Sequence, residues 1–396
     1  MPRWSTSAAG PAGWSSAGWS ANSINAPPQA GHQSAAVSGL STAWQWLQTR
    51  SISERLPDQS GPATTWAPSF RLLLAKGWDT GNSCRRPPGS TAGARYTGLM
   101  YPPVRLVAID MDGTLLPTLG REISPRTALA LKAAQEAGIT VAIATGRRAA
   151  YTAPLLEGLG LRADTPIVAS NGAVIRTLGG ESIESRQMEA RVARGLCGLL
   201  RPFGAVVFTF DRPGRGELVL EDLDRAHGRI ALWVEANRNS IEVVKPLERV
   251  LADGEDPIQG MAAGSLARMR EAEKAVKASE WGGNCECMRT EYPGRDLSIL
   301  DLLPKGVTKG WALERLAARL GVNRRETMAI GDNWNDVKML EWSGQGVIMS
   351  NAAAELRAMA KLRGWQQAPS NDEDGVAVVL EVAVRKVAAV VDAPQV

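Results

Sequence analysis

The sequence has few cysteines, few histidines and no long uninterrupted apolar run, and each scarcity excludes a class of protein. Its 396 residues include four Cys and two His, too few thiols for a disulfide scaffold in a chain of this length. Cys285 and Cys287 are close together, but no second Cys or His pair lies at zinc-ligand spacing, so no structural zinc site is expected. Charged residues interrupt every apolar stretch before about 18 residues accumulate, which excludes a transmembrane helix.

Basic charge is concentrated near the start of the chain. The net charge is +4 at pH 7, yet residues 1–99 hold eight basic and three acidic residues, and the remaining 37 basic and 38 acidic residues give −1. The later residues contain no basic cluster of the kind that binds nucleic acid. We therefore expect no nucleic-acid partner. We also expect no membrane association, no obligate protein partner and a cytoplasmic location.

Residues 1–99 differ in composition from the rest. They are rich in Ser, Gly, Ala and Pro, contain the near-repeat AGWSSAGWS and hold seven of the 13 Trp. No long segment among them has helical or strand periodicity. We predict a low-complexity, disordered extension, or a start codon assigned too early with Met100 as the true start. A targeting segment and an interaction module that uses exposed Trp are the alternatives.

From Met100 onward, apolar strands alternate with amphipathic helices. This alternation predicts an α/β fold, a doubly wound, Rossmann-like parallel sheet whose ligands bind beyond the carboxyl ends of the strands. The predicted strands are Val104–Ile109, Thr140–Ala144, Ile167–Ser170 and Thr327–Ile330, and the predicted helices run from Ser124-Pro125 to Gly138 and from Gly310 to Leu320.

Two carboxylates follow the first predicted strand. Asp110 and Asp112 belong to the sequence DMDGT. Such a pair is often a pair of turn or helix-capping acids, but the preceding strand and the Gly-Thr-Leu-Leu continuation favour a functional site. Carboxylates this close repel each other unless a cation or a shared proton relieves them. Mg²⁺, which binds carboxylates, waters and phosphate, fits best.

Three further elements lie at similar places. Thr145-Gly146 follows a strand and offers a hydroxyl and backbone N–H groups to a phosphate, although such a pair is often only a turn. Lys309 precedes a helix, and nearby Lys305 is interpreted as a surface residue. Asp332 and Asp336 follow the strand Thr327–Ile330 and would share one face of a helix that starts there; capping acids are the alternative.

Together these elements resemble the haloacid dehalogenase superfamily of phosphatases, and within it the Cof-type hydrolases. The resemblance covers about residues 101–385 and includes Ser170–Ala173, Asn351-Ala352 and Asn371–Val376. It implies a core of residues 100–180 and 296–396, with an inserted α/β cap at residues 181–295 that closes over the site.

The resemblance also implies residue roles. Asp110 would be the nucleophile that forms an aspartyl-phosphate, and Asp112 the general acid and then the base. Mg²⁺ would be held by Asp110, Asp332 and the backbone carbonyl of Asp112, and the phosphoryl oxygens by Thr145 and Lys309. Asn335 and Asp336 would orient the lysine and the phosphate region. Further substrate or phosphate contacts are expected from Gly146, Arg147, Asn171 and Gly172.

The cap segment carries no catalytic motif. We expect helices at Met188–Leu200, Glu242–Ala252 and Ser265–Ala278 and a strand at Ala205–Phe210, with Cys285 and Cys287 as two incidental strand cysteines. Charged cap residues that could face the substrate are Asp211, Arg212 and Arg215.

The predicted function is Mg²⁺-dependent hydrolysis of small phosphomonoesters, such as sugar phosphates or phosphorylated cofactors. A phosphosugar mutase on the same core and a catalytically weak phosphate-binding regulatory protein are the alternatives. The complete set of expected catalytic residues argues against the regulatory protein, because a phosphate-binding protein has no need of the acid Asp112.

Deletion of residues 1–99 is expected to leave a folded, active protein, because the predicted strands and motifs all lie beyond them. Phosphate release by the full chain and by a chain that starts at Met100 measures this. Loss of activity in the shorter chain would contradict the interpretation of the extension as dispensable.

Overall fold

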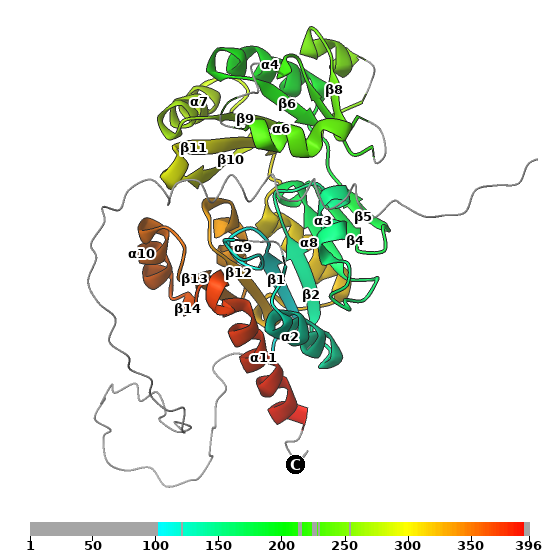
Figure 1. The fold of residues 1–396 in the computed structure, drawn as a ribbon, viewed down its shortest axis with the longest axis vertical. Coiled ribbons are helices and arrows are strands. Elements are labelled where there is room, and N and C mark those ends of the chain that lie inside the picture. Colours follow the sequence, from blue (N-terminus) through cyan, green and yellow to red (C-terminus); the bar gives the residue numbers. More distant parts are fainter. Residues whose placement is uncertain are drawn as a thin grey trace, which may run out of the picture.

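Two β-sheets organise the part of the chain that the structure describes (Figure 1). The structure is a computed structural model that describes residues 102–391, apart from 120–121, 213–215, 224–227, 229 and 253–254. The predicted extension, residues 1–99, and the cap residue Arg215 lie outside the described residues. Among the residues described, no helix is both long and apolar enough to cross a membrane.

The first sheet has eight strands in the order β14-β13-β12-β1-β2-β3-β4-β5. The strands from β14 to β3 are parallel, and β4 and β5 add an antiparallel edge. Their bounds are β1 (Leu106–Asp110), β2 (Thr140–Ala144), β3 (Pro166–Ala169), β4 (Val174–Thr177), β5 (Ser182–Ser185), β12 (Thr327–Gly331), β13 (Gln345–Met349) and β14 (Gln366–Ala368).

Helices cover both faces of this sheet, as a doubly wound fold requires. Val107 and Ile109 of β1 belong to the hydrophobic core on one face, and Leu106 and Ala108 to the core on the other. One face packs against α2 (Pro125–Glu136), α3 (Ala149–Leu156) and α11 (Gly375–Val391), and the other against α8 (Lys309–Leu320), α9 (Val337–Trp342) and α10 (Ala354–Arg363). The predicted fold class is confirmed.

The second sheet has six strands in the order β10-β11-β9-β6-β7-β8. Their bounds are β6 (Val206–Thr209), β7 (Leu218–Leu220), β8 (Ile241–Val243), β9 (Gln259–Gly264), β10 (Cys285–Tyr292) and β11 (Leu297–Pro304). Helices α4 (Ala190–Leu200) and α7 (Leu266–Ala278) pack on one face and α6 (Ala231–Asn237) on the other. This sheet and its helices form a second domain above the first (Figure 1).

Local sequence signals explain where the helices begin and end. The Ser124 hydroxyl accepts a hydrogen bond from Thr127 N at the start of α2, and Pro125 occupies its first turn. The Thr308 hydroxyl accepts from Trp311 N at the start of α8, and Gly321, with φ of 61°, ends that helix. These are the capping residues and the left-handed glycine that helix ends favour.

One cap prediction needs correction. The helix expected at Glu242–Ala252 is wrong, because β8 covers Ile241–Val243 and a 3₁₀-helix covers Leu247–Ala252. Pro246 lies between them and has no N–H to continue a helical hydrogen-bond ladder. Cys285 and Cys287, in contrast, are free thiols in β10, as the interpretation of two incidental strand cysteines expects.

Strand pairing also moves the predicted domain boundaries. β5 pairs with β4 in the first sheet, and β11 pairs with β9 in the second. The chain crosses between the sheets near Arg186, whose N–H donates to Ala173 O, and Met188, whose N–H donates to Pro257 O. The boundary predicted at residue 295 falls between two adjacent strands of the second sheet, because the apolar run Leu297–Pro304 is a buried strand and not a linker.

Leu131→Ala is expected to lower the free energy of unfolding by about 2–5 kcal/mol, because Leu131 is fully buried between α2 and the first sheet. Leu129→Ala on the same helix removes a side chain that is 68% exposed, and a change under about 0.5 kcal/mol is expected. Urea denaturation followed by circular dichroism measures both. Equal losses would contradict the assigned buried face of α2.

Candidate active site

The predicted site residues meet at the carboxyl edge of the first sheet. Asp110 is the last residue of β1, Thr145 follows β2, Asn171 follows β3 and Asp332 follows β12. β1 lies between β2 and β12 in the sheet, so residues more than 200 positions apart become neighbours. This is the edge at which ligands of doubly wound sheets bind.

Lys309 is a fully buried ammonium group between two carboxylates. Its Nζ donates to Asp110 Oδ1 at 2.5 Å and to Asp336 Oδ1 at 2.7 Å. Burial alone would lower the pKa of Lys309, but the charges of Asp110 and Asp336 outweigh it and raise the pKa above its usual value. Lys309 therefore remains protonated, and Lys305, the competing candidate, is exposed.

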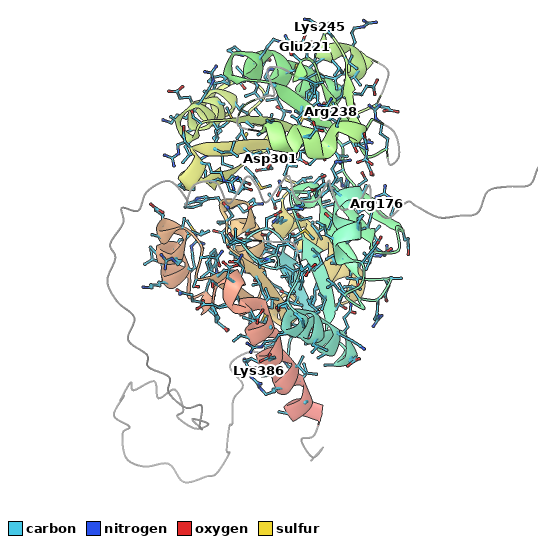
Figure 2. All side chains as sticks on the ribbon, viewed as in Figure 1. Arg176, Glu221, Arg238, Lys245, Asp301 and Lys386 are labelled. Atoms are coloured by element: carbon cyan, nitrogen blue, oxygen red, sulfur yellow. The ribbon has the colours of Figure 1, made fainter. Side chains whose placement is uncertain are left out.

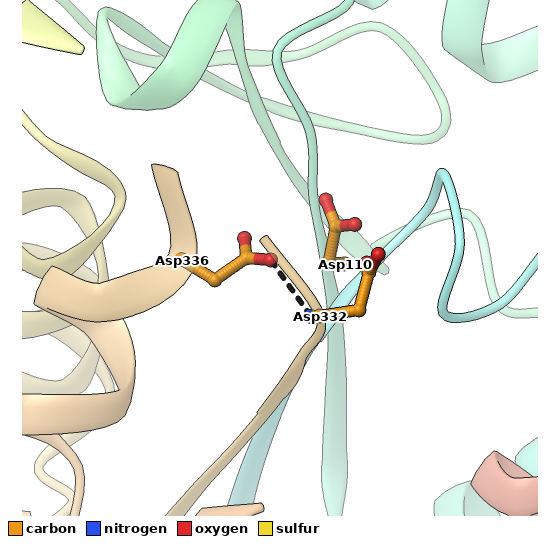
Figure 3. A group of neighbouring side chains, drawn as sticks. All are labelled: Asp110, Asp332 and Asp336. Atoms are coloured by element: carbon orange, nitrogen blue, oxygen red, sulfur yellow. Dashed lines mark hydrogen bonds between the residues drawn. The ribbon is translucent and has the colours of Figure 1, made fainter. Parts of the chain in front are cut away.

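Three carboxylates form an acidic cluster (Figure 3). Asp110, Asp332 and Asp336 each offer an oxygen within 4.8 Å of the others. Burial, followed by the charge of Asp336, raises the pKa of Asp110 to about 7 although Lys309 opposes the shift. Burial and the charges of Asp110 and Asp336 raise the pKa of Asp332 well above its usual value. The cluster thus has more negative charge than Lys309 balances, and a hard divalent cation would relieve it.

Asp336 has its oxygens engaged within the protein. Its Oδ1 accepts from Lys309, and its Oδ2 accepts from the backbone N–H groups of Asp332 and Asn333, both at 3.0 Å. It caps a 3₁₀-helix, Trp334–Asp336, so Asp332 and Asp336 do not share one face of a helix starting at Asp332 as expected. Asp336 is therefore a capping acid, as the alternative interpretation states. Asp110 and Asp332 remain as the carboxylates that could hold a metal ion.

A glycine lets the Asp112 loop approach Asp332. Gly113 has φ of 82°, and a Cβ at this position would lie 2.4 Å from Asp332 Oδ2. Thr114 Oγ1 donates to Asp332 Oδ1 at 2.9 Å. The loop after β1 and the loop after β12 thus fit together only with glycine at residue 113.

Arg147 binds the half-buried carboxylate of Asp112. Its Nε donates to Asp112 Oδ2 at 2.7 Å and its Nη2 to Asp112 Oδ1, while its guanidinium lies 5.2 Å from the centre of the Tyr151 ring. The sequence did not indicate this pairing. Arg147 also lines the cavity beside Asp110, so its predicted substrate contact stays a prediction.

The turn after β3 supports the loop after β2. Asn171 N donates to Thr145 O at 2.9 Å and Ser170 N to Arg147 O at 2.8 Å. Thr145 is fully buried, and its Oγ1 accepts from Arg147 N. Gly172 has φ of 109° and packs so closely that a Cβ would lie 2.4 Å from Thr308 O, next to Lys309.

Sequence reasoning missed two buried polar residues of the second domain. Asp301 Oδ2 accepts from Asn171 Nδ2 at 3.0 Å, and its Oδ1 accepts from Gln259 Nε2 at 2.7 Å. Burial raises the pKa of Asp301 to about 7 although both hydrogen bonds oppose the shift. The available signal was an acid within the otherwise apolar run of β11, because such a residue is rarely buried without a partner.

A cavity of about 100 Å³ lies between the domains, with Asp110, Asp112 and Asn335 on the side of the first sheet. Its wall from the second domain combines polar and apolar side chains, among them Thr209, Trp233, Gln259, Met261, Ile299 and Asp301.

Asp211 and Arg212, two of the cap residues proposed to face the substrate, line a separate cavity. Asp211 Oδ1 accepts from Arg176 at 2.8 Å, and Arg212 pairs with Glu242 and Glu255. Their contacts in this structure are ion pairs outside the cavity that contains Asp110.

Comparisons with known proteins find a matching family and similar chains. A family model described as haloacid dehalogenase-like hydrolase matches residues 107–380. The chain is 28% identical to a 5-amino-6-(5-phospho-D-ribitylamino)uracil phosphatase of Bacillus subtilis, over 70% of this chain and 97% of the relative. It is 28% identical to an HMP-PP phosphatase of Serratia proteamaculans, over 64% of this chain and 87% of the relative. A solved haloacid dehalogenase-like hydrolase from Bacteroides thetaiotaomicron superposes with a TM-score of 0.57 at 25% identity, covering 70% of this chain and 99% of that one.

Lys309→Met is expected to lower the free energy of unfolding by about 3–5 kcal/mol in metal-free buffer, because it leaves two buried carboxylates without their counter-charge. Lys305→Met, at an exposed position, is the matched control, with an expected change under about 0.5 kcal/mol. Chemical denaturation of the two variants and the wild type measures the difference. Similar stability of both variants would show that Lys309 is not the counter-charge of the cluster.

Proposed function

We propose that this chain, which belongs to the haloacid dehalogenase-like hydrolase family, is a Mg²⁺-dependent phosphomonoester hydrolase that works through an aspartyl-phosphate. One observation carries the proposal. Asp110, Asp112, Lys309 and Asp332 converge at one sheet edge, and Asp110 and Asp112 line a cavity whose opposite wall belongs to the second domain. Phosphoryl transfer depends mainly on such positioning and charge neutralisation.

In the first step, a carboxylate oxygen of Asp110 attacks phosphorus, and the bond from phosphorus to the leaving oxygen breaks. Asp112, protonated at this stage, gives its proton to that oxygen. Arg147 holds the Asp112 side chain in the cavity wall, next to Asp110, by bonds to both of its oxygens. One of these bonds must break for Asp112 to carry the proton. The product is an aspartyl-phosphate on Asp110 and a free alcohol.

In the second step, Asp112 is a carboxylate and takes a proton from water as the water oxygen attacks phosphorus. The acyl-phosphate bond from phosphorus to the Asp110 oxygen breaks, which restores the Asp110 carboxylate and releases inorganic phosphate. The covalent intermediate divides one difficult displacement into two easier ones. One carboxyl group serves as acid and then base, so the mechanism requires no histidine.

Thr145 and Lys309 are suited to hold the transferring phosphoryl group. The Thr145 hydroxyl accepts from Arg147 N and can donate its own hydrogen to a phosphoryl oxygen. The Lys309 ammonium is fixed beside Asp110 by Asp336 and places a positive charge where negative charge develops. Gly146 packs closely against the Asn171 side chain and Gly172 against the backbone of Thr308, next to Lys309.

The donor set fits Mg²⁺. Asp110 and Asp332 would hold it together with the backbone carbonyl of Asp112, because hard cations prefer oxygen ligands and the carboxylates present excess negative charge. When bound, Mg²⁺ supplies positive charge beside the phosphoryl oxygens and screens the nucleophile from them.

The proposed substrates are small phosphorylated metabolites, such as sugar phosphates or phosphorylated cofactors. The relatives' names, an aminouracil phosphatase and an HMP-PP phosphatase, support this class. The second domain covers the cavity and would exclude bulk water from the aspartyl-phosphate. A cytoplasmic location agrees with such substrates.

The full chain is expected to release inorganic phosphate from a panel of small phosphomonoesters with Mg²⁺, to stop when EDTA is added and to recover when Mg²⁺ is restored. Asp110→Asn and Asp112→Ala are each expected to reduce kcat at least about a thousandfold while circular dichroism shows an unchanged fold. Asp164→Asn, at an acid whose side chain is 64% exposed, is the control and should keep the wild-type rate.

Near-wild-type rates in Asp110→Asn or Asp112→Ala would refute the assigned nucleophile and acid. Formation of an isomeric sugar phosphate without release of phosphate would point to the mutase alternative. EDTA-resistant activity would contradict the role of Mg²⁺.

A further inference from the structure

A continuous line of side-chain hydrogen bonds runs from the second domain into the active site. Gln259 Nε2 donates to Asp301 Oδ1 at 2.7 Å, Asn171 Nδ2 donates to Asp301 Oδ2 at 3.0 Å, and Asn335 Nδ2 donates to Asn171 Oδ1 at 3.1 Å. All four side chains are buried. Asp301 lies on the side of the second domain that faces the first (Figure 2).

The acid in this line determines which way each amide is turned. Both oxygens of Asp301 accept hydrogen bonds here, as those of an ionised carboxylate do, whereas an amide has a donating and an accepting end. Asn171 must therefore turn its NH₂ group toward Asp301, which leaves its oxygen facing Asn335. Asn335 must in turn direct its NH₂ group toward Asn171.

This orientation decides what Asn335 offers to a ligand. An amide NH₂ group has two hydrogens, and the bond to Asn171 uses one. Asn335 lines the cavity that contains Asp110. Its Oδ1 is buried and has no hydrogen-bond partner among the described residues, so no contact of that oxygen sets the orientation.

Asn171 also connects this line to the loop after β2. Its backbone N–H donates to Thr145 O, and a Cβ at Gly146 would lie 3.1 Å from Asn171 Nδ2. The backbone bond to Thr145 does not depend on how the Asn171 amide is turned, so a change in the amide orientation reaches the cavity through Asn335.

We propose that Asp301 is a positioning residue that acts from the second domain: it sets the amide orientation of Asn171 and, through it, of Asn335, so that Asn335 presents an N–H to a phosphoryl oxygen. The inference rests on the proposed function, because it takes the phosphoryl group to bind beside Asp110. Asp301 then supports binding of the phosphoryl group itself, whatever leaving group the substrate carries.

Asp301→Asn is the direct test, because the new amide has nearly the same shape but can donate, which removes the constraint on Asn171. Titration calorimetry with inorganic phosphate and Mg²⁺ is expected to show at least about tenfold weaker binding, the cost of one lost charge-assisted hydrogen bond. The value of kcat/KM is expected to fall by a similar factor for acetyl phosphate and for pyridoxal 5′-phosphate, whose leaving groups differ greatly in size.

Asp211→Asn is the matched control. Asp211 is also an acid of the second domain that binds a side chain of the first, with Arg176 Nη2 donating to its Oδ1 at 2.8 Å, but it lies outside the cavity of Asp110. Phosphate binding by this variant is expected to stay within twofold of wild type.

A double-mutant cycle separates positioning from simple stabilisation of the fold. In an Asn335→Ala background, Asp301→Asn is expected to add no further loss of phosphate affinity, because its effect passes through Asn335. If Asp301→Asn does not fold, Asn171→Gly breaks the same line while allowing the φ of 53° found at that position, and the same loss is expected.

Unchanged phosphate affinity in Asp301→Asn, or additive losses in the cycle, would overturn the inference. A loss confined to pyridoxal 5′-phosphate would overturn it too, since it would show that Asp301 contacts the leaving group directly. Wild-type protein that binds phosphate but hydrolyses no ester would refute the proposed function and leave the binding test of Asp301 valid.

Discussion

The buried ammonium of Lys309, between Asp110 and Asp336, is the interaction on which the rest of the site depends. An ion pair inside a protein is tolerated only when each charge has partners, and here the partners come from β1, from the first turn of α8 and from the turn after β12. Asp336 is held by two backbone N–H groups, so its position is set by the chain itself. The arrangement retains an excess of negative charge, which a hard divalent cation would relieve.

The second domain forms one wall of the cavity and also makes hydrogen bonds to the first domain. Its inner wall supplies Asp301, which accepts hydrogen bonds from Gln259 and from Asn171. The turn at Asn171 is itself hydrogen-bonded to the loop of Thr145. Arg176 and Asp211 make a second bridge between the domains, away from the cavity of Asp110. The domains are thus joined both beside the cavity of Asp110 and away from it.

Much of the first domain could be predicted from sequence, because its strands are apolar runs that end in polar residues and its helices carry ordinary caps. β2 was predicted with the bounds that the structure has, and the resemblance to the haloacid dehalogenase superfamily is confirmed. The errors concern features set by tertiary contacts. The sequence assigned β11 to the start of the second core segment, but β11 pairs with β9 in the second sheet. The pairing of Arg147 with Asp112, which was not predicted, joins two loops 35 residues apart. The hydrogen bond between Asp301 and Asn171 joins residues 130 positions apart.

The insertion of one domain into the other determines the order in which the chain can fold during synthesis. β1 pairs with β2 on one side and with β12 on the other, and in the second pairing Leu106 lies opposite Thr327. The cap sheet and its helices lie between these partners in sequence and need nothing beyond Pro304 for their strand pairing. On the ribosome the second sheet can therefore form its strand pairs before β12, β13 and β14 of the first sheet have been synthesised. Until then the nascent chain presents one edge of β1 unpaired, and Asp110 meets Lys309 and Asp332 only when the sheet is completed.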